Sequence, residues 1–161
     1  MKLKPGLKWK LPPKIKIYEA LGCLADGRLK KIDNDIRVYS SSRNKYYTVQ
    51  YDENKNAIMA NDNGSFWVGY LGYPSIAYLM KIGKLPFNQQ YSKALKDIPW
   101  KDINLKNKNN FAKTILEVDE ILKQKDVDLK ELYIFLDKIE EAIKEKGLAL
   151  LGAKQRPPRE Q

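Results

Sequence analysis

The sequence contains no histidine and a single cysteine, Cys23. Without histidine the chain cannot form a Ser-His-Asp or Cys-His catalytic system, and it lacks the usual general base and every zinc site that includes a histidine. One cysteine excludes an internal disulfide and a metal site made of cysteines alone, and it fits a reducing compartment. We therefore expect no cofactor and no metal. Enzymes that work with Asp, Glu or Lys stay open in principle, but no catalytic motif supports one, so a non-enzymatic protein is expected.

Long apolar segments are also missing. The chain has no apolar run of about 18 residues, so no transmembrane helix and no membrane partner are expected. The first residues, MKLKPGLKWKLPPK, carry charge without an apolar core, which is not the pattern of a secretory signal. The expected location is the cytoplasm, with association with the nucleoid as one option.

Positive charge is abundant and unevenly distributed. The formal net charge is +10; residues 1–50 hold 12 Lys and Arg against 4 Asp and Glu, whereas residues 111–161 hold 10 against 11. An excess of cations in one half of a chain is typical of a protein that binds nucleic acid. The alternative is coding bias, because the abundant Lys, Ile, Asn and Tyr can all follow from base composition.

Residues 1–12 are predicted to form a basic arm. Six lysines precede the first carboxylate of the chain, Glu19. Such an arm can lie along phosphates and become ordered on binding, while the alternative is a solvated terminal strand. These lysines are Lys2, Lys4, Lys8, Lys10, Lys14 and Lys16.

Residues 13–86 predict a small α+β domain. Pro13 suits the first turn of a helix that Gly27 can end. The segments RLKKI, DIRVYSS and KYYTVQYD then predict an antiparallel meander of three strands, and NAIMA predicts a fourth. A second helix is expected from Pro74 to about Gly83.

The predicted sheet has a basic face that bears tyrosines. Tyr47, Val49 and Tyr51 alternate with polar residues and share one face of their strand. A basic sheet with tyrosines can bind phosphates and stack bases, or the tyrosines can simply fill the core. The full set predicted to bind nucleic acid is Lys2, Lys4, Lys8, Trp9, Lys10, Lys14, Lys16, Arg28, Lys30, Arg37, Arg43 and Lys45.

The C-terminal half predicts three further parts. Residues 87–108 are expected to be a connector, residues 109–152 an antiparallel helical hairpin, and residues 153–161 a disordered tail. Apolar residues repeat with heptad spacing along both helices of the hairpin. This seam either packs on the domain or meets a protein partner. The candidates for partner contact are Leu132, Leu136 and Ile139.

Three segments carry a resemblance to a known family. KIYEALGCLADGRL, RVYSSSRNKYYTVQYD and GYPSIAYLMKIGKLP, within residues 14–83, resemble the SWIM zinc finger of small archaeal proteins. The resemblance implies a ββα core, DNA binding and protein contacts of the kind found in recombination and transposition. The four ligand positions correspond to Met59, Asn61, Tyr73 and Ser75, which cannot form a tetrahedral zinc site. The resemblance is thus to a SWIM-type protein that has lost its zinc.

The segment ANDNGSFWVGYLGYPSIAYLM, residues 60–80, combines aromatic residues with glycines. If the zinc is lost, large aromatic side chains are one way to replace its contribution to folding. We therefore expect Phe66, Trp67, Tyr70 and Tyr73 to form a substitute core. The alternative is an exposed aromatic loop that binds a partner.

The expected fold class is α+β, with an antiparallel meander, flanking helices and a C-terminal helical hairpin. The expected function is non-catalytic binding of nucleic acid, independent of sequence and with DNA favoured over RNA, in replication or recombination. The alternative function is that of an adaptor that contacts other proteins through residues 111–151 and the aromatic loop.

Overall fold

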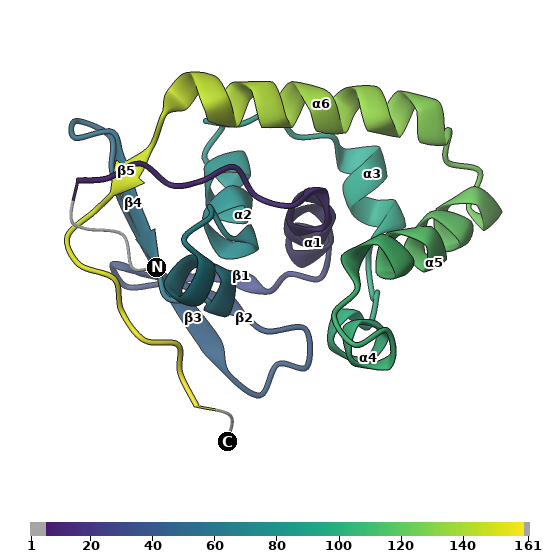
Figure 1. Ribbon diagram of the computed structural model, residues 1–161, viewed down its shortest axis with the longest axis horizontal. Coiled ribbons are helices and arrows are strands. Elements are labelled where there is room, and N and C mark those ends of the chain that lie inside the picture. The colour runs from purple at the N-terminus through teal and green to yellow at the C-terminus, as the bar shows by residue number, and fades with distance from the viewer. Residues whose placement is uncertain (1–5, 160–161) are drawn as a thin grey trace.

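A five-stranded, mostly antiparallel sheet flanked by helices forms the fold, so the α+β class expected from the sequence is confirmed (Figure 1). The structure is a computed structural model that describes residues 6–159. The strands are β1 (Leu29–Ile32), β2 (Asp35–Tyr39), β3 (Tyr46–Asp52), β4 (Ala57–Ala60) and β5 (Ala149–Leu150). The helices are α1 (Lys14–Ala25), the π-helix η1 (Gly64–Val68), α2 (Tyr73–Lys81), α3 (Gln89–Ala94), α4 (Trp100–Lys106), α5 (Phe111–Gln124) and α6 (Leu129–Lys146).

The meander of β1 to β4 has the register that alternation predicts. Val38 of β2 stands opposite Leu29 and Tyr47, and Val49 stands opposite Ala60. Tyr47 and Val49 are buried on this inner face, as their spacing predicts. Strand β5 adds to the edge of β4 in parallel orientation and was not predicted, because two residues carry no periodic signal.

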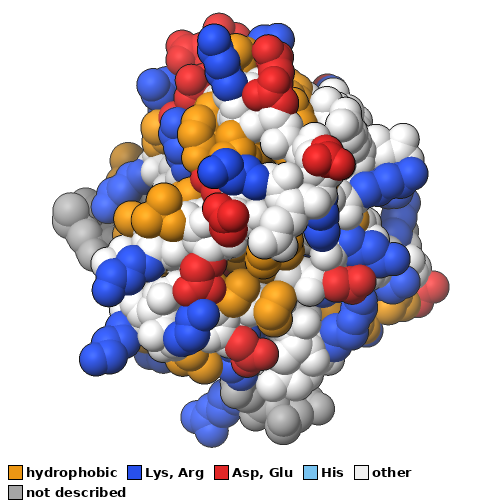
Figure 2. All heavy atoms as spheres, turned by 90° about the vertical axis from the view of Figure 1, so that its right-hand side faces the viewer, with side chains coloured by type: hydrophobic (Ala, Val, Ile, Leu, Met, Phe, Trp, Pro, Cys, Tyr) orange, Lys and Arg blue, Asp and Glu red, His pale blue; other side chains and the backbone are white. Residues whose placement is uncertain are grey.

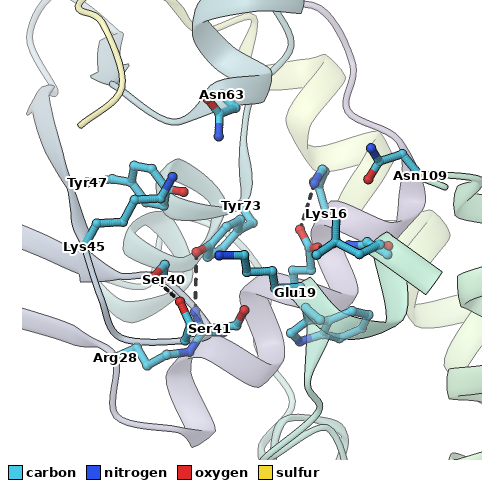
Figure 3. A pocket seen from close by; sticks show the side chains of 15 residues that line it. Lys16, Glu19, Arg28, Ser40, Ser41, Lys45, Tyr47, Asn63, Tyr73 and Asn109 are labelled. Atoms are coloured by element: carbon cyan, nitrogen blue, oxygen red, sulfur yellow. Dashed lines mark hydrogen bonds and ion pairs between the residues drawn. The ribbon is translucent and has the colours of Figure 1, made fainter. Parts of the chain in front are cut away.

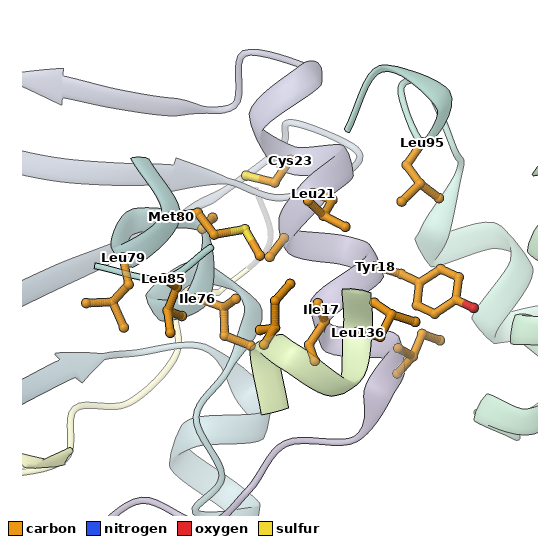
Figure 4. Close-up of a cluster of buried hydrophobic side chains, with 14 of the residues drawn as sticks. Ile17, Tyr18, Leu21, Cys23, Ile76, Leu79, Met80, Leu85, Leu95 and Leu136 are labelled. Carbon is orange, nitrogen blue, oxygen red and sulfur yellow. The ribbon is translucent and has the colours of Figure 1, made fainter. Parts of the chain in front are cut away.

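Helix α1 is the centre of the core. Pro13 precedes its first residue, and Gly27, with φ of 66°, ends it; the N–H of Arg28 donates to the Cys23 carbonyl at 3.1 Å. Ile17, Tyr18 and Leu21 of α1 are buried among residues of α2 and α6 (Figure 4). Burial raises the pKa of the Cys23 thiol to about 12, so this cysteine is an inert packing residue.

One core spans the parts that the sequence divides. The buried cluster runs from Ile15 in α1 to Leu148 before β5 and includes Trp100 and Ile103 from the predicted connector. Residues 87–108 are therefore not a loose connector: they form α3 and α4, which pack on the same core. The composition of this stretch, with its prolines and asparagines, hides two helices of six and seven residues.

The seam of the C-terminal helices packs on the domain. Leu132, Leu136 and Ile139 are each 0 % exposed and belong to the common core. Helix α6 contacts α1 as well as α5. Of the two alternatives for the seam, self-packing is the one that the structure has. These three side chains are therefore unavailable to a protein partner in this conformation.

The predicted basic arm is held against the domain in its described part. The backbone N–H of Trp9 donates to Leu148 at 3.0 Å, its indole N–H donates to Ile58 at 2.8 Å, and the N–H of Lys10 donates to Gly69 at 3.0 Å. The cause is Trp9, whose indole finds a carbonyl partner in β4. Lys2 and Lys4 lie outside the described residues.

The described part of the C-terminal tail, residues 153–159, also lies on the domain, contrary to the disorder expected there. Lys154 donates to the Phe66 carbonyl at 2.6 Å, and Asn61 donates to the Arg156 carbonyl at 3.3 Å. The guanidinium of Arg156 lies 5.6 Å from the ring centre of Phe66. Cation–π contacts to an aromatic helix explain why a polar tail packs here.

Candidate functional site

A cleft of about 240 Å³ opens between the loop after β2, helix α1 and helix α4 (Figure 3). Four cations line it, each from a different segment of the chain, and Glu19 is the one carboxylate among its lining residues. The remaining lining includes three consecutive serines, Ser40 to Ser42, and two tyrosines. The four cations are Lys16, Arg28, Lys45 and Lys101.

Arg28 is fixed in place by partners from three directions. Its side chain is 1 % exposed, and its Nε donates to Asp26 at 3.2 Å. Its Nη1 donates to the Tyr39 carbonyl at 2.9 Å and to the Tyr73 hydroxyl at 3.4 Å. Its Nη2 is buried and has no hydrogen-bond partner among the described residues. A planar guanidinium held on one edge in this way presents its other edge to an anion.

Two more polar atoms of the cleft are buried without a partner in the described part of the chain. They are the indole N–H of Trp100 and the side-chain oxygen of Asn104, both in α4. Each buried polar group without a hydrogen bond costs about 1–3 kcal/mol. Three such groups among the lining residues of one cleft indicate a site that is completed by something outside the chain.

Helix α1 supplies an ion pair to the opposite wall of the cleft. Lys16 donates to Glu19 at 3.0 Å, and Asn104 donates to the other oxygen of Glu19 at 3.4 Å. Burial alone would lower the pKa of Lys16, but Glu19, Tyr70 and Asp62 outweigh burial and raise this pKa above its usual value. Lys16 is therefore a cation at any physiological pH.

Tyr47 and Tyr73 form the inner corner of the cleft. Their rings meet edge to face with centres 6.3 Å apart. Burial raises the pKa of Tyr73 well above its usual value, with Arg28 opposing, so its hydroxyl keeps its proton. Because that oxygen accepts from Arg28, its proton can be donated to a ligand. Lys45 stands over the Tyr47 ring, 5.6 Å from its centre.

The structure brings together three of the residues predicted to bind nucleic acid, Lys16, Arg28 and Lys45, in this cleft. Lys30 and Arg37 are cross-strand neighbours on the outer face of the sheet. The prediction placed Arg28 on that outer face as well. It lies instead in the cleft, because it follows the end of α1 and turns inward to Tyr39 and Tyr73.

The other predicted cations lie elsewhere. Arg43 donates to the Asp26 carbonyl at 2.8 Å, and Lys14 pairs with Asp137 of α6 at 3.2 Å. Lys8 and Lys10 flank β5 and η1, where Lys10 donates to the Val68 carbonyl at 3.2 Å. The twelve predicted residues are thus not one continuous track.

A second basic surface lies on η1. Trp67 is 56 % exposed, and the Arg156 guanidinium lies 5.8 Å from its ring centre. Lys10 and Lys154 contact the carbonyls of the same short helix. Asn63, which precedes η1, also lines the cleft, so the start of this helix adjoins the cleft (Figure 3). We call Trp67 with Lys10, Lys154 and Arg156 the Trp67 surface.

Sequence reasoning missed the contribution of α4 to the site. Trp100, Lys101 and Asn104 were assigned to a connector, and only the size of Trp100 signalled that this segment is anchored. Gly22 of α1 faces this part of the chain, since a Cβ there would stand 2.7 Å from the Leu95 carbonyl oxygen at the end of α3 and 3.4 Å from the Trp100 indole nitrogen. A glycine inside a predicted helix was the available signal.

The family model described as "uncharacterised conserved protein UCP014422" matches residues 9–149. The chain belongs to this family. No curated protein and no solved structure gives a match. The match extends over α1 to β5 and includes every residue that lines the cleft. The cleft and the shared core are thus part of the family domain rather than of an appended segment.

Neither a metal-type cluster of side chains nor a membrane-spanning helix is found among the described residues. Residues 6–159 hold no cluster of three or more His, Cys, Asp or Glu side chains with the geometry of a metal site. Within the same range, no helix has the length and apolar character that crossing a membrane requires. Of the four positions that correspond to zinc ligands, Asn61 instead accepts a hydrogen bond from the Thr48 N–H at 2.8 Å.

Proposed function

We propose that the protein binds nucleic acid without catalysing a reaction on it. The observation that carries this proposal is the convergence of four cations from four segments on one cleft that holds a single carboxylate. Phosphates are the common feature of every nucleic acid, and lysine and arginine contacts to them supply most sequence-independent affinity. The SWIM resemblance supports the same proposal, since it implies DNA binding.

The Trp67 surface supports a single strand as the ligand. An exposed aromatic ring beside cations is the usual platform on which an unpaired base stacks, with about 1–3 kcal/mol per stacked base. The face shown in Figure 2 carries Lys and Arg side chains interspersed with Asp and Glu. We therefore propose a short single-stranded segment of DNA or RNA that crosses η1 between the Trp67 surface and the cleft.

Non-catalytic binding is part of the proposal. Glu19 is the one acidic residue that lines the cleft, and it accepts hydrogen bonds from both Lys16 and Asn104. Both of its oxygens are thus engaged within the chain, and the described lining residues include no second carboxylate that could form an acid–base pair with it.

The adaptor alternative has lost one of its two suggested surfaces, because Leu132, Leu136 and Ile139 are buried in the chain's own core. The other surface, the aromatic loop, keeps Trp67 exposed. The cations around that indole favour a nucleic acid over an apolar protein surface there. Nucleic-acid binding is therefore the better supported proposal.

The test is a titration of fluorescent single-stranded DNA, single-stranded RNA and duplex DNA at low and moderate salt. We expect both single strands to bind more tightly than the duplex, with affinity that falls steeply as salt rises. Trp67→Ala should weaken single-strand binding by roughly 5- to 100-fold, which corresponds to the loss of one stacked base. Lys138→Glu, on the far exposed side of α6, changes the charge as a control and should have little effect. Equal binding of all three ligands by the wild type and the Trp67 variant would refute the preference for a single strand, and no binding of any ligand at low salt would refute nucleic-acid binding itself.

A further inference from the structure

The cleft holds more buried hydrogen-bonding capacity than its own chain uses. Nη2 of Arg28 and the indole N–H of Trp100 are donors without partners, and the side-chain oxygen of Asn104 is an acceptor without one. The residues that carry the two donors are 1 % and 3 % exposed. Surface cations that merely attract a polyanion have no reason to be buried at such a cost.

Arg28 indicates the chemistry of the group that fits its side of the cleft. Its guanidinium donates to the Tyr73 hydroxyl at 3.4 Å, and Ser40 and Ser41 line the same cleft (Figure 3). Ser40 and Ser42 both donate to the side chain of Asn44, which holds this loop in place. A fixed guanidinium beside hydroxyl groups is the usual arrangement around the oxygens of a phosphate.

The opposite wall offers acceptors. Glu19 and the free oxygen of Asn104 face the cleft from α1 and α4, and both can accept from hydroxyl or amine groups of a ligand. A ligand that fills the site thus combines an anionic, acceptor-rich end with a part that carries donors. A phosphate joined to a sugar and a base has both, and a cleft of about 240 Å³ has room for one nucleotide unit at most.

The buried donors also indicate that the group reaching them is the end of a ligand. Trp100 closes the space between α4 and α1, since its indole nitrogen lies 3.4 Å from the position of a Cβ on Gly22. A strand that continued past Arg28 would meet the packed core of α1. A phosphate in the middle of a strand has a nucleoside on both sides and cannot enter a recess of this kind.

We propose that the cleft recognises a phosphate monoester on a nucleoside, either the phosphorylated 5′ end of a single strand or a free mononucleotide. Where the ligand is a strand end, this inference rests on the nucleic-acid binding proposed above. Arg28 and Tyr73 donate to the phosphate, Lys45 neutralises it at the mouth, and Glu19 with Asn104 accepts from the sugar or base. The protein then distinguishes a phosphorylated strand end from an unphosphorylated one and does not distinguish base sequences.

The test compares one oligonucleotide in three forms, with a 5′ phosphate, with a 5′ hydroxyl and with a 3′ phosphate. Adenosine 5′-monophosphate, adenosine and inorganic phosphate are assayed alongside as small probes, by tryptophan fluorescence and by the shift in Tm. We expect the 5′-phosphorylated strand to bind at least about tenfold more tightly than the hydroxyl form, a difference of about 1.4 kcal/mol. The monophosphate should raise Tm, whereas adenosine should not.

Lys45→Met is the test variant, because Lys45 stands at the mouth of the cleft and its loss leaves the buried partners of Arg28 intact. It should abolish the preference for the 5′ phosphate. Lys138→Met removes one exposed charge on α6 and should keep that preference. Arg28→Lys keeps the positive charge but loses the planar guanidinium. If Arg28→Lys folds with unchanged Tm, it should also lose the preference for the 5′ phosphate.

The outcomes separate the two proposals. Single strands that bind equally well with and without the 5′ phosphate, in wild type and in the Lys45 variant, would overturn this inference and leave nucleic-acid binding in place. Stabilisation by the monophosphate without binding of any strand would support the site and overturn the proposed function. If none of the strands or small probes binds or raises Tm, both proposals are wrong.

Discussion

Replacing Gly22 by alanine separates what the sequence predicts from what the structure predicts. Gly22 lies inside α1, where alanine is favoured over glycine by about 1 kcal/mol, so the sequence alone predicts a more stable protein. In the structure a Cβ at this position would stand 2.7 Å from the Leu95 carbonyl oxygen and 3.4 Å from the Trp100 indole nitrogen. The first distance is shorter than any normal contact, so α1 must move away from the end of α3.

That movement is resisted by the packing on both sides. Ser92 of α3 donates to the Leu21 carbonyl at 2.6 Å, and Leu95 is 0 % exposed. Overpacking in a filled core costs about 1–3 kcal/mol, and the gain in helix propensity offsets about 1 kcal/mol of that cost. We expect Gly22→Ala to destabilise the protein by about 0–2 kcal/mol, or to lower Tm by up to roughly 8 °C for a chain of this length.

The measurement is urea unfolding followed by circular dichroism, with the slope of the transition checked to be unchanged. Lys138→Ala and Lys138→Gly, at an exposed position of α6, give the propensity difference between alanine and glycine in the same protein. If Gly22→Ala is more stable than the wild type by that same difference, the close contact between α1 and the end of α3 is wrong.

Three further predictions follow from burial and hydrogen bonding. Leu136 is 0 % exposed, so Leu136→Ala should lower the free energy of unfolding by about 2–5 kcal/mol. Leu116 is 71 % exposed, so Leu116→Ala should change it by less than about 0.5 kcal/mol. An equally small loss for both variants would show that Leu136 is not packed in the core and would restore the partner-binding role of the seam. Burial raises the pKa of Asp62 above its usual value of 3.8, so the native state binds a proton more tightly than the unfolded chain. The free energy of unfolding therefore includes a contribution from protonated Asp62 in acid, and this contribution falls as pH rises from 3.8 through the higher pKa of the native state. We expect Asp62→Asn to lack this decrease in stability. Unfolding curves of both proteins, measured from acid to neutral pH, test the expectation. Deleting residues 1–12 should lower Tm as well as charge because Trp9 bonds to β4, and a deletion with unchanged Tm would show that the arm is detached.

Local patterns predicted much of the fold. The turns and alternation of residues 28–60 are sufficient for the four-stranded meander and its inner face, since each is set by neighbours along the chain. Helix α1 begins after Pro13 and ends at Gly27 for equally local reasons. The heptad seam predicted the buried face of α6, including Leu136, but not what would cover it.

The parts that could not be predicted depend on contacts between distant segments. Strand β5 has two residues and exists because β4 offers an unpaired edge. Helix α4 brings Trp100, Lys101 and Asn104 to a cleft whose other cations include Lys16 and Arg28, which are far away in the sequence. Arg28 looks like any surface cation in the sequence, and only the folded chain shows it buried against Tyr39 and Tyr73. Charge composition therefore suggested a class of ligand, while the location of the candidate site needed the tertiary structure.

The aromatic and glycine-rich segment shows how core and surface roles combine. Gly64 and Gly72 have no room for a side chain, because a Cβ would stand 2.3 Å from the Tyr70 ring and 2.0 Å from the Asp62 carboxylate, respectively. Ser65 donates to that carboxylate at 2.6 Å, which fixes the start of η1.

Phe66 and Tyr70 are buried in this segment, as the substitute-core hypothesis expects, but Trp67 faces outward and was assigned to the core wrongly. The Phe66 and Trp67 rings meet edge to face with centres 4.6 Å apart, and Phe66 lies on the domain side of this contact while Trp67 is exposed. Tyr70 and Asp62 fill the space where Gly64 and Gly72 would carry side chains. This close packing holds η1 in place, and with it the exposed indole of Trp67. A rigid aromatic platform loses less entropy when a base stacks on it than a mobile loop would, which is why a packed loop suits a binding surface better than a flexible one.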